Sequence, residues 1–425
     1  MGKRARTYAA AGLILLGVLS ESAFAQSPQP LLSLERAIAN TLAQNPQLHQ
    51  FSLKHEALLG RRESYDLSPS LNAGVEIENL AGSGNFSSTQ SAEITLALSS
   101  VIELGGKRSA RVSVANSQIQ SLEYQRQAST LDVLGELTAV FIRTIALQEQ
   151  ILLARESRDL AKNTLAIVKR RAAQGATPDS EVQRAAATFA QANLRLTAFE
   201  QGHERLAIKL AAYWGDTSPS LSAIEGDLYR FVAIPNYEDL YQRAQSSPTI
   251  NMFASEKRLK RAELALAETQ SIGDINWQLG VRRFEESGDT AFTAGVSIPL
   301  FAGRRNSGAI QSARAAQNEV EFAQQSALLK LHVQLFEAHS QWRQHVNAVT
   351  AYRKTILPDL TSAMNATQQA YEAGRYSYQD WISAQNELLD AKRALIENAA
   401  AAALNQAVIE QLIAEPVNNT DAIDH

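Results

Sequence analysis

The chain has 425 residues, no cysteine, and a formal net charge of −4 at pH 7 from 40 basic and 44 acidic residues. The absence of cysteine excludes disulfides, thiolate metal ligands, a thiol nucleophile and a lipid-acylated cysteine anchor. The small net charge gives no electrostatic case for binding nucleic acid. The length allows two or three ordinary domains or one elongated unit.

Residues 1–25 have the pattern of a signal peptide. Basic residues near the start precede an apolar run from Ala9 to Leu19, and Ala23-Phe24-Ala25 fits a cleavage site. The apolar run is too short for a membrane-spanning helix, and no later stretch approaches the ~20 apolar residues that such a helix needs. We therefore expect an exported protein whose mature chain starts at Gln26 and whose only membrane-crossing segments are strands.

The first half of the mature chain, 26–214, is expected to contain helices around a pair of strands. A helical pattern begins after a capping serine, Ser33, and Asn45-Pro46 either kinks this helix or divides it in two. Strands follow at about 70–79 and 91–102, and a long helix at 108–173. A glycine-containing turn then precedes a returning helix.

Both strands alternate apolar and polar residues, so each has one apolar and one polar face. In the first strand, Val75 and Ile77 alternate with Glu76 and Glu78. Acidic side chains at Glu76, Glu78 and Glu93 lie on the polar face, where copies of the chain could form acidic rings that attract divalent cations. The alternative is an ordinary wet lumen, which needs only polar side chains.

The second half repeats the plan of the first. A linker at 215–235 is followed by a second unit at 236–414, with strands at about 275–285 and 291–299, a long helix at 304–373 and a C-terminal tail at 415–425. Corresponding landmarks are offset by about 200 residues, far above the period of solenoid repeats. The chain is therefore interpreted as a tandem duplication of one large unit.

Helix lengths and strand number predict the architecture. The long helix of about 66 residues spans ~100 Å, which two shorter helices in line can match. Four strands per chain cannot seal themselves in lipid, because the smallest closed membrane barrels have eight and an open edge leaves amides unsatisfied. Copies of the chain are therefore expected to join: two would give eight strands, and three would give twelve and a passage.

The duplicated strand-hairpin plan, Glu76-Ile-Glu-Asn79 and Glu103-Leu-Gly-Gly-Lys-Arg108 resemble the TolC-like outer-membrane efflux proteins. Within that family they are most similar to the CzcC-type subunits of cobalt–zinc–cadmium resistance pumps. The resemblance implies a mainly α-helical fold with a membrane β-barrel portion: four strands per protomer in a trimeric α/β barrel. It also implies the outer membrane of a Gram-negative cell, with the helices extending into the periplasm.

The resemblance further implies a non-enzymatic duct without cofactors, working with a periplasmic adaptor protein and an inner-membrane proton-driven pump of the resistance-nodulation-division type. The turns far from the membrane would form the aperture and the adaptor contact. Aperture positions are Arg375, Tyr376, Tyr378 and Asp380, and adaptor-docking positions are Arg171, Gly175, Pro178 and Gly374. Ser383 stands where relatives have a second aperture aspartate. Trp381 beside these residues is expected to shape the closed aperture rather than pack in a core.

The junctions between strands and long helices repeat a glycine and basic pattern: Gly105, Gly106, Lys107 and Arg108 in the first half, and Gly303, Arg304 and Arg305 in the second. The glycines allow a sharp change of chain direction. The basic residues contact anionic lipid headgroups or form a solvated turn.

The histidines His332, His339 and His345 share one helix but lack the close spacing of a metal site, so a structural role is expected. The leading hypothesis is an exit duct for heavy-metal cations. The alternatives are a duct for drugs or a secreted polypeptide, and a structural coiled-coil protein that spans the envelope without a channel. An outer-membrane phospholipase would need a Ser/His pair on neighbouring strands, and the predicted strands contain no histidine.

Overall fold

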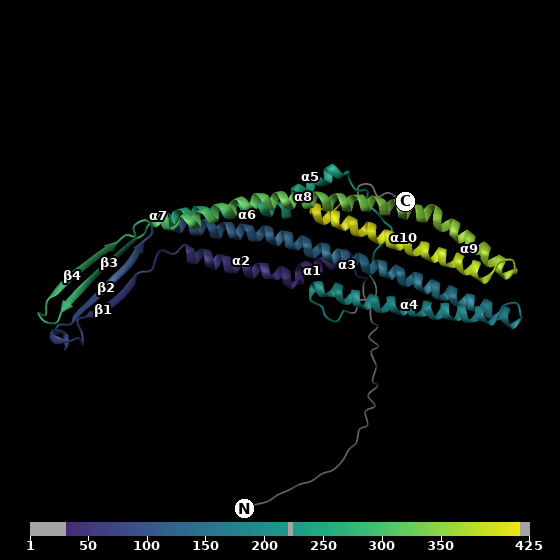
Figure 1. The fold of residues 1–425 in the computed structure, drawn as a ribbon, viewed down its shortest axis with the longest axis horizontal. Helices are drawn as coiled ribbons and strands as arrows, with labels where there is room; N and C mark the ends of the chain where they lie inside the picture. Colours follow the sequence, from purple (N-terminus) through teal and green to yellow (C-terminus); the bar gives the residue numbers. More distant parts are fainter. Residues whose placement is uncertain (1–30, 220–223, 417–425) are drawn as a thin grey trace, which may run out of the picture.

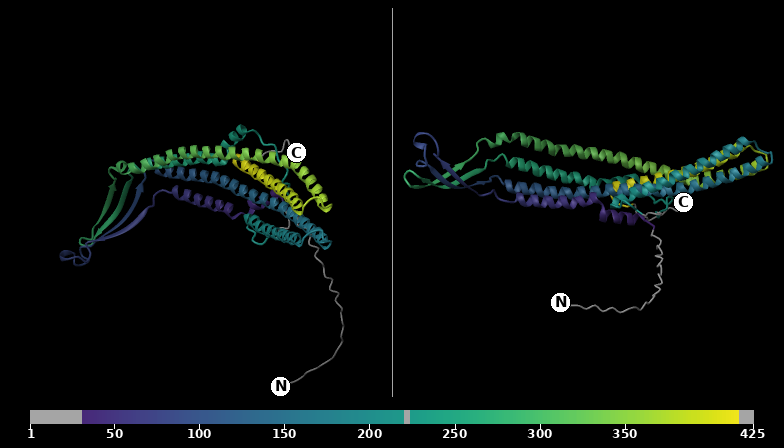
Figure 2. Two further views of the ribbon diagram at one scale, coloured as in Figure 1. Left: turned by 45° about the vertical axis from the view of Figure 1, so that its right-hand side comes forward. Right: turned by 90° about the horizontal axis from the view of Figure 1, so that it is seen from below.

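The computed structural model describes residues 31–219 and 224–416. The expected signal peptide and residues 417–425 of the expected tail lie outside the described residues. The described chain is an elongated rod with a sheet at one end and two helical turns at the other (Figure 1). Figure 2 shows the same rod from two further directions.

The two halves share one plan: two helices, a pair of strands, a long helical segment and a returning helix. The first half contains α1 (Leu34–Gln44), α2 (Pro46–Tyr65), β1 (Asn72–Glu78), the 3₁₀ turn η1 (Gly84–Phe86), β2 (Glu93–Ile102), α3 (Lys107–Ala173), α4 (Asp179–Ala211) and the 3₁₀ turn η2 (Ala212–Trp214). The second half contains α5 (Tyr237–Gln245), α6 (Pro248–Thr269), β3 (Ile275–Phe284), β4 (Thr290–Ser297), α7 (Ala302–Arg305), α8 (Ser307–Ala351), the π turn η3 (Tyr352–Ile356), α9 (Leu357–Glu372) and α10 (Tyr378–Ile413).

Asn45 divides the first helical segment into α1 and α2. Its side-chain oxygen accepts hydrogen bonds from the backbone N–H groups of Gln47 and Leu48, at 2.9 and 3.1 Å, while Pro46 takes the first helical position. Proline is favoured there because its missing N–H has no helical partner at that position. Ser247-Pro248 makes the same break between α5 and α6.

The four strands form one antiparallel sheet in the order β1-β2-β3-β4. Each half supplies one hairpin, and β2 pairs with β3, for example through Leu98 opposite Leu279. The sheet therefore unites two segments that are far apart in the sequence. Of the described strands, β1 and β4 each have one edge without a partner strand.

One face of the sheet is apolar and exposed. Val75, Leu96, Val281 and Phe292 are successive cross-strand partners in one row across all four strands. All four side chains are exposed, and that of Phe292 is 92% exposed. The alternation predicted from the sequence is therefore present, and no layer of residues 31–219 or 224–416 covers its apolar side.

The helical body is built around α3, which runs from the sheet to the far turns (Figure 1). The shorter helices α2 and α4 both pack against α3, α8 packs against α6 and α10, and α9 packs against α10. The halves also meet, because α3 contacts α6 and α10. Five fully buried side chains from five helices mark the centre of the core: Leu137, Leu210, Leu240, Leu335 and Ile409. Each such burial contributes roughly 1.5–3 kcal/mol.

The helix expected at 304–373 is interrupted. A short α7 ends at Arg305, and α8 leads through the π turn η3 into α9. Pro358 is the second residue after the π turn. It has no N–H, and its ring collides with the carbonyl four residues earlier, so a regular α-helix cannot continue through it. No helix in the described ranges combines the length and the apolar character needed to cross a membrane.

Candidate functional site

The two turns at the far end of the rod have the same backbone geometry. Gly175 and Gly374 follow the ends of α3 and α9 with φ of 72° and 75°. The next residues close the turns: the N–H of Ala176 bonds to the carbonyl of Arg171 at 2.9 Å, and that of Arg375 bonds to the carbonyl of Ala370 at 2.8 Å. These are glycine-terminated helix ends of the Schellman type. Nothing lies within 4 Å of an added Cβ at either glycine, so backbone conformation rather than space requires glycine.

The turns enclose a small core of their own, formed by Val168, Ala185, Tyr371, Tyr378 and Trp381. The rings of Tyr371 and Trp381 stack with centroids 4.9 Å apart. Trp381 is 1% exposed and Tyr378 is 5% exposed. The expectation that Tyr378 and Trp381 shape the aperture is therefore wrong for their side chains, because α3 and α4 cover them.

Arg171 joins the two turns. Its Nη1 donates to the carbonyls of Tyr371 and Glu372, at 3.0 and 3.1 Å, and its guanidinium carbon lies 4.7 Å from the centre of the Tyr371 ring. These carbonyls belong to the last turn of α9, where cations are favoured. Arg171 is therefore already engaged within the chain. Gly175, Pro178 and Gly374 are exposed on the turns, and their contact with an adaptor stays a prediction.

Asp380 caps α10. Its Oδ2 accepts from the backbone N–H of Ser377 at 3.0 Å and from its hydroxyl at 2.7 Å, while the Ser377 hydroxyl accepts from the Asp380 N–H at 3.2 Å. The bond from the Ser377 hydroxyl, followed by that from its N–H, lowers the pKa of the Asp380 carboxyl. No ion pair joins Arg375 to Asp380 in the described chain. Arg375 and Tyr376 are exposed beside this cap, and Tyr376 is 55% exposed.

The polar face of the sheet carries a charged cluster that the sequence only partly revealed. Arg282 on β3 forms ion pairs with Glu78 at 2.6 Å and with Glu93 at 2.8 Å, and donates to the hydroxyl of Thr95 at 2.9 Å. Glu76 lies on the same face, exposed and without an ion pair among the described residues. Two of the three expected acidic side chains are therefore paired with a guanidinium. The alternation of residues in β3 could have predicted that Arg282 lies on the polar face, because it places this residue on the same side as Asn276 and Gln278.

The first strand-to-helix junction is held by two ion pairs. Lys107 Nζ lies 2.7 Å from Asp274 Oδ1, and Arg111 contacts Glu103 through two parallel bonds of 2.5 and 2.9 Å. The bond from Arg111 is the main reason why the pKa of Glu103 is lowered. Lys107 is buried, so it is not available to contact lipid headgroups.

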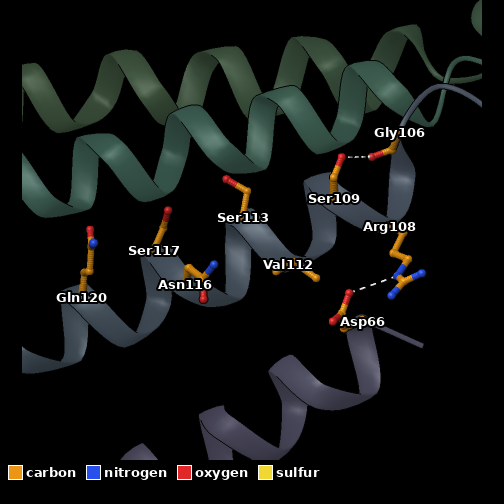
Figure 3. Close-up of a pocket in the computed structure, with 9 residues that line it drawn as sticks. All are labelled: Asp66, Gly106, Arg108, Ser109, Val112, Ser113, Asn116, Ser117 and Gln120. Carbon is orange, nitrogen blue, oxygen red and sulfur yellow. Dashed lines mark hydrogen bonds and ion pairs between the residues drawn. The ribbon is translucent and has the colours of Figure 1, made fainter. Parts of the chain in front are cut away.

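Arg108 lies over a polar groove of about 710 Å³ between α2 and the start of α3. Figure 3 shows its guanidinium directed at Asp66, at 3.0 Å, with Ser113 and Asn116 further along the groove. The basic residues of the second junction, Arg304 and Arg305, are exposed and form no ion pair in the described chain. Headgroup contact therefore remains a proposal for these two arginines.

The junction glycines differ in their roles. Gly105 and Gly106 have φ of 73° and 75°, and a Cβ at Gly105 would lie 2.6 Å from the side chain of Ile272. Gly303 does not have a positive φ. At the second junction the left-handed residue is Phe301, with φ of 63°, so the expected turning role of Gly303 belongs to Phe301.

The histidines lie in structural surroundings. His332 Nδ1 is 2.7 Å from the hydroxyl of Tyr237, and His345 Nδ1 is 2.8 Å from Asn398 Oδ1. Burial is the main reason why the pKa of His339 is lowered. Over the described residues, no group of three or more His, Cys, Asp or Glu side chains is arranged to hold a metal ion.

An open sheet continuous with paired helical hairpins defines the class: a protomer of the TolC-like fold. The family model of outer membrane efflux proteins matches residues 37–216 and 240–415, most of both halves. The chain therefore belongs to the outer membrane efflux protein family, and both the expected family and the expected outer-membrane location are confirmed.

Three relatives show the breadth of the family. The cobalt-zinc-cadmium resistance protein CzcC of Cupriavidus metallidurans is 27% identical over 68% of this chain and 70% of its own length. The nickel-cobalt-cadmium resistance protein NccC of Alcaligenes xylosoxydans xylosoxydans is 25% identical over 60% and 58%. The pyoverdine export outer membrane protein OpmQ of Pseudomonas putida is 23% identical over 68% and 63%. The chain thus spans less than two thirds of NccC and OpmQ.

Solved structures confirm the fold. CusC matches with a TM-score of 0.76 at 15% identity, covering 89% of this chain and 91% of that one. VceC from Vibrio cholerae matches with a TM-score of 0.73 at 18% identity, covering 91% and 97%. At these identities the likeness concerns the fold alone.

Proposed function

We propose that this protein is the outer-membrane exit duct of a tripartite efflux system and that its cargo is heavy-metal cations. The observation that carries the duct is the open four-stranded sheet, which has an exposed apolar face, a polar face and two unpartnered edges in the described chain. In lipid, these edges need partner strands. Three copies supply twelve strands, with the apolar faces toward lipid and the polar faces around a passage.

The far turns are the proposed meeting point with the adaptor and, through it, with a proton-driven inner-membrane pump. Arg375 and Tyr376 are exposed there, and the two glycine turns present backbone rather than bulky side chains. Asp380 stays a candidate for the aperture, although it also caps α10. The chain itself supplies a path, and the energy for export comes from the pump.

Two observations support metal cations as the cargo. CzcC and NccC are metal-resistance proteins by name, and the polar face of the sheet carries Glu76, Glu78 and Glu93. Acidic linings raise the local concentration of cations. The similarity to OpmQ, a pyoverdine export protein, supports a second candidate: a duct for organic molecules.

The test of cargo is a deletion strain and its complementation. We expect deletion to lower the tolerated concentration of zinc, cadmium, cobalt or copper, and the wild-type gene to restore it. Trp381→Ala removes a buried ring from the core of the turns, so we expect this variant to reach the outer membrane in a smaller amount. It serves as a control that relates metal tolerance to the amount of protein in the membrane. Unchanged metal tolerance together with lost resistance to organic compounds would favour the second candidate.

A further inference from the structure

The polar face of the sheet changes character along its length. One row across all four strands consists of small residues that are successive cross-strand partners: Gly74, Ala97, Gly280 and Thr293. A Cβ at Gly280 would lie 2.8 Å from the carbonyl oxygen of Leu96 and 2.8 Å from the Thr293 hydroxyl. Long side chains are therefore absent from this level of the described sheet, and the polar face is shallow here.

The charged residues lie on the loop side of this row, away from the helices. Glu76, Thr95 and Arg282 are cross-strand partners in the next row of the polar face. Glu78 is directly opposite Glu93 in the row after that. The side chains of Glu76, Glu78, Glu93 and Arg282 are longer than those of the small residues before them. If this face lines a passage, the passage is wide at the level of the small residues. It is narrower and charged at the next level, near the loop ends of the strands.

Arg282 makes this charged level possible. Like charges directly opposite one another on neighbouring strands destabilise a sheet. The guanidinium of Arg282 contacts both Glu78 and Glu93, and it also holds Thr95. Each copy then contributes three carboxylates and one guanidinium to this level, a net charge of −2. Without Arg282 the net charge would be −3.

We propose that Glu76, Glu78, Glu93 and Arg282 form the charge-selective level of the duct, and that Arg282 sets how strongly it favours cations. This inference rests on the proposed function, because the polar face must line a passage. A ring of fixed charges selects ions through its local potential, and one guanidinium in each copy changes that potential substantially.

The experiment measures reversal potentials in planar bilayers across a potassium chloride gradient. The wild-type channel is expected to favour K⁺ over Cl⁻. Arg282→Gln should raise the K⁺/Cl⁻ permeability ratio about threefold or more at low salt, and the difference should shrink at 1 M salt, where screening acts within ~3 Å. Glu76→Gln should lower the ratio.

Neighbouring residues supply matched controls. Arg283 is adjacent but lies in a row of the opposite face with Ile94, and its Nε bonds to Glu285 at 3.0 Å. Arg283→Gln should therefore leave the ratio unchanged. The double variant Arg282→Gln/Glu93→Gln restores the net charge of −2 and removes one of the two facing carboxylates, so its ratio should match that of the wild type.

The outcomes separate this inference from the proposed function. Failure of the wild-type protein to form channels contradicts the duct itself. Normal channels in which Arg282→Gln and Arg283→Gln share the wild-type ratio overturn the role of Arg282 alone. If Arg282→Gln does not assemble, Glu76→Gln decides, because Glu76 has no ion pair among the described residues to lose. An unchanged ratio in that variant also overturns the proposal.

Discussion

Several of the charged residues that the sequence singled out form contacts within the chain that stabilise local structure. Lys107 is held by Asp274, Arg108 by Asp66, and Arg171 by carbonyls of α9. Residue types and spacing could identify these positions as important, but not their partners. Asp274, for example, lies 167 residues from Lys107 in the sequence. The sequence could therefore single out these residues but could not give the partners that hold them.

At the residue scale, the Glu103–Arg111 pair predicts a pH-dependent contribution to stability. The bond from Arg111 lowers the pKa of Glu103 below its ordinary value of 4.5. The pair should therefore stabilise the folded state fully above about pH 4.5 and lose that effect as the pH falls through the lowered pKa. We expect Glu103→Gln to lower the free energy of unfolding by about 2 kcal/mol at pH 7.

The measurement is thermal unfolding of detergent-solubilised protein between pH 7 and pH 3. The stability difference between the wild type and Glu103→Gln should narrow toward the acid end. Glu387→Gln removes an exposed carboxylate that forms no ion pair in the described chain, and it should leave the curve unchanged. A Glu103→Gln difference that grows with acidity would contradict the account.

At the scale of elements, short sequence patterns predicted the structural features that depend only on neighbouring residues. The period of two in the strands, the glycine turns and the Asn45-Pro46 break could all be read from short stretches. The pairing of β2 with β3 could not, because alternation does not specify a partner strand. The π turn did have a signal in Pro358, inside an otherwise helical pattern.

The far turns show the limit of local reasoning most clearly. A helix end usually has little core around it, so aromatic residues such as Trp381 suggested an exposed functional role. The structure packs Trp381 against Tyr371, while Val168 on α3 and Ala185 on α4 belong to the same cluster. Two hairpins from different halves create this core jointly, which neither half indicates alone.

Arg171 is expected to hold these two hairpins together. Arg171→Ala removes two hydrogen bonds to α9 carbonyls and a contact with the Tyr371 ring, a loss of about 1–3 kcal/mol confined to the turns. Hydrogen exchange should accelerate at the amides of Gly374 and Arg375, which close the second turn. Arg170→Ala, an exposed neighbour without an ion pair in the described chain, should not change these rates. Equal exchange in both variants would remove Arg171 from this role.

At the scale of the whole molecule, the sheet is the part that a single chain leaves incomplete. The helical body has a buried core to which seven helices contribute, whereas the sheet leaves an apolar face exposed and, in the described chain, two free edges. A stable membrane protein cannot keep those edges open in lipid. The proposed duct and its proposed ion selectivity both depend on other copies completing this sheet.

The most direct test is therefore the mass of the detergent-extracted protein, measured by native mass spectrometry or light scattering. The account predicts a particle of three chains that is recovered from the outer-membrane fraction. Protein that remains monomeric after gentle extraction, or that fractionates without the membrane, would contradict it.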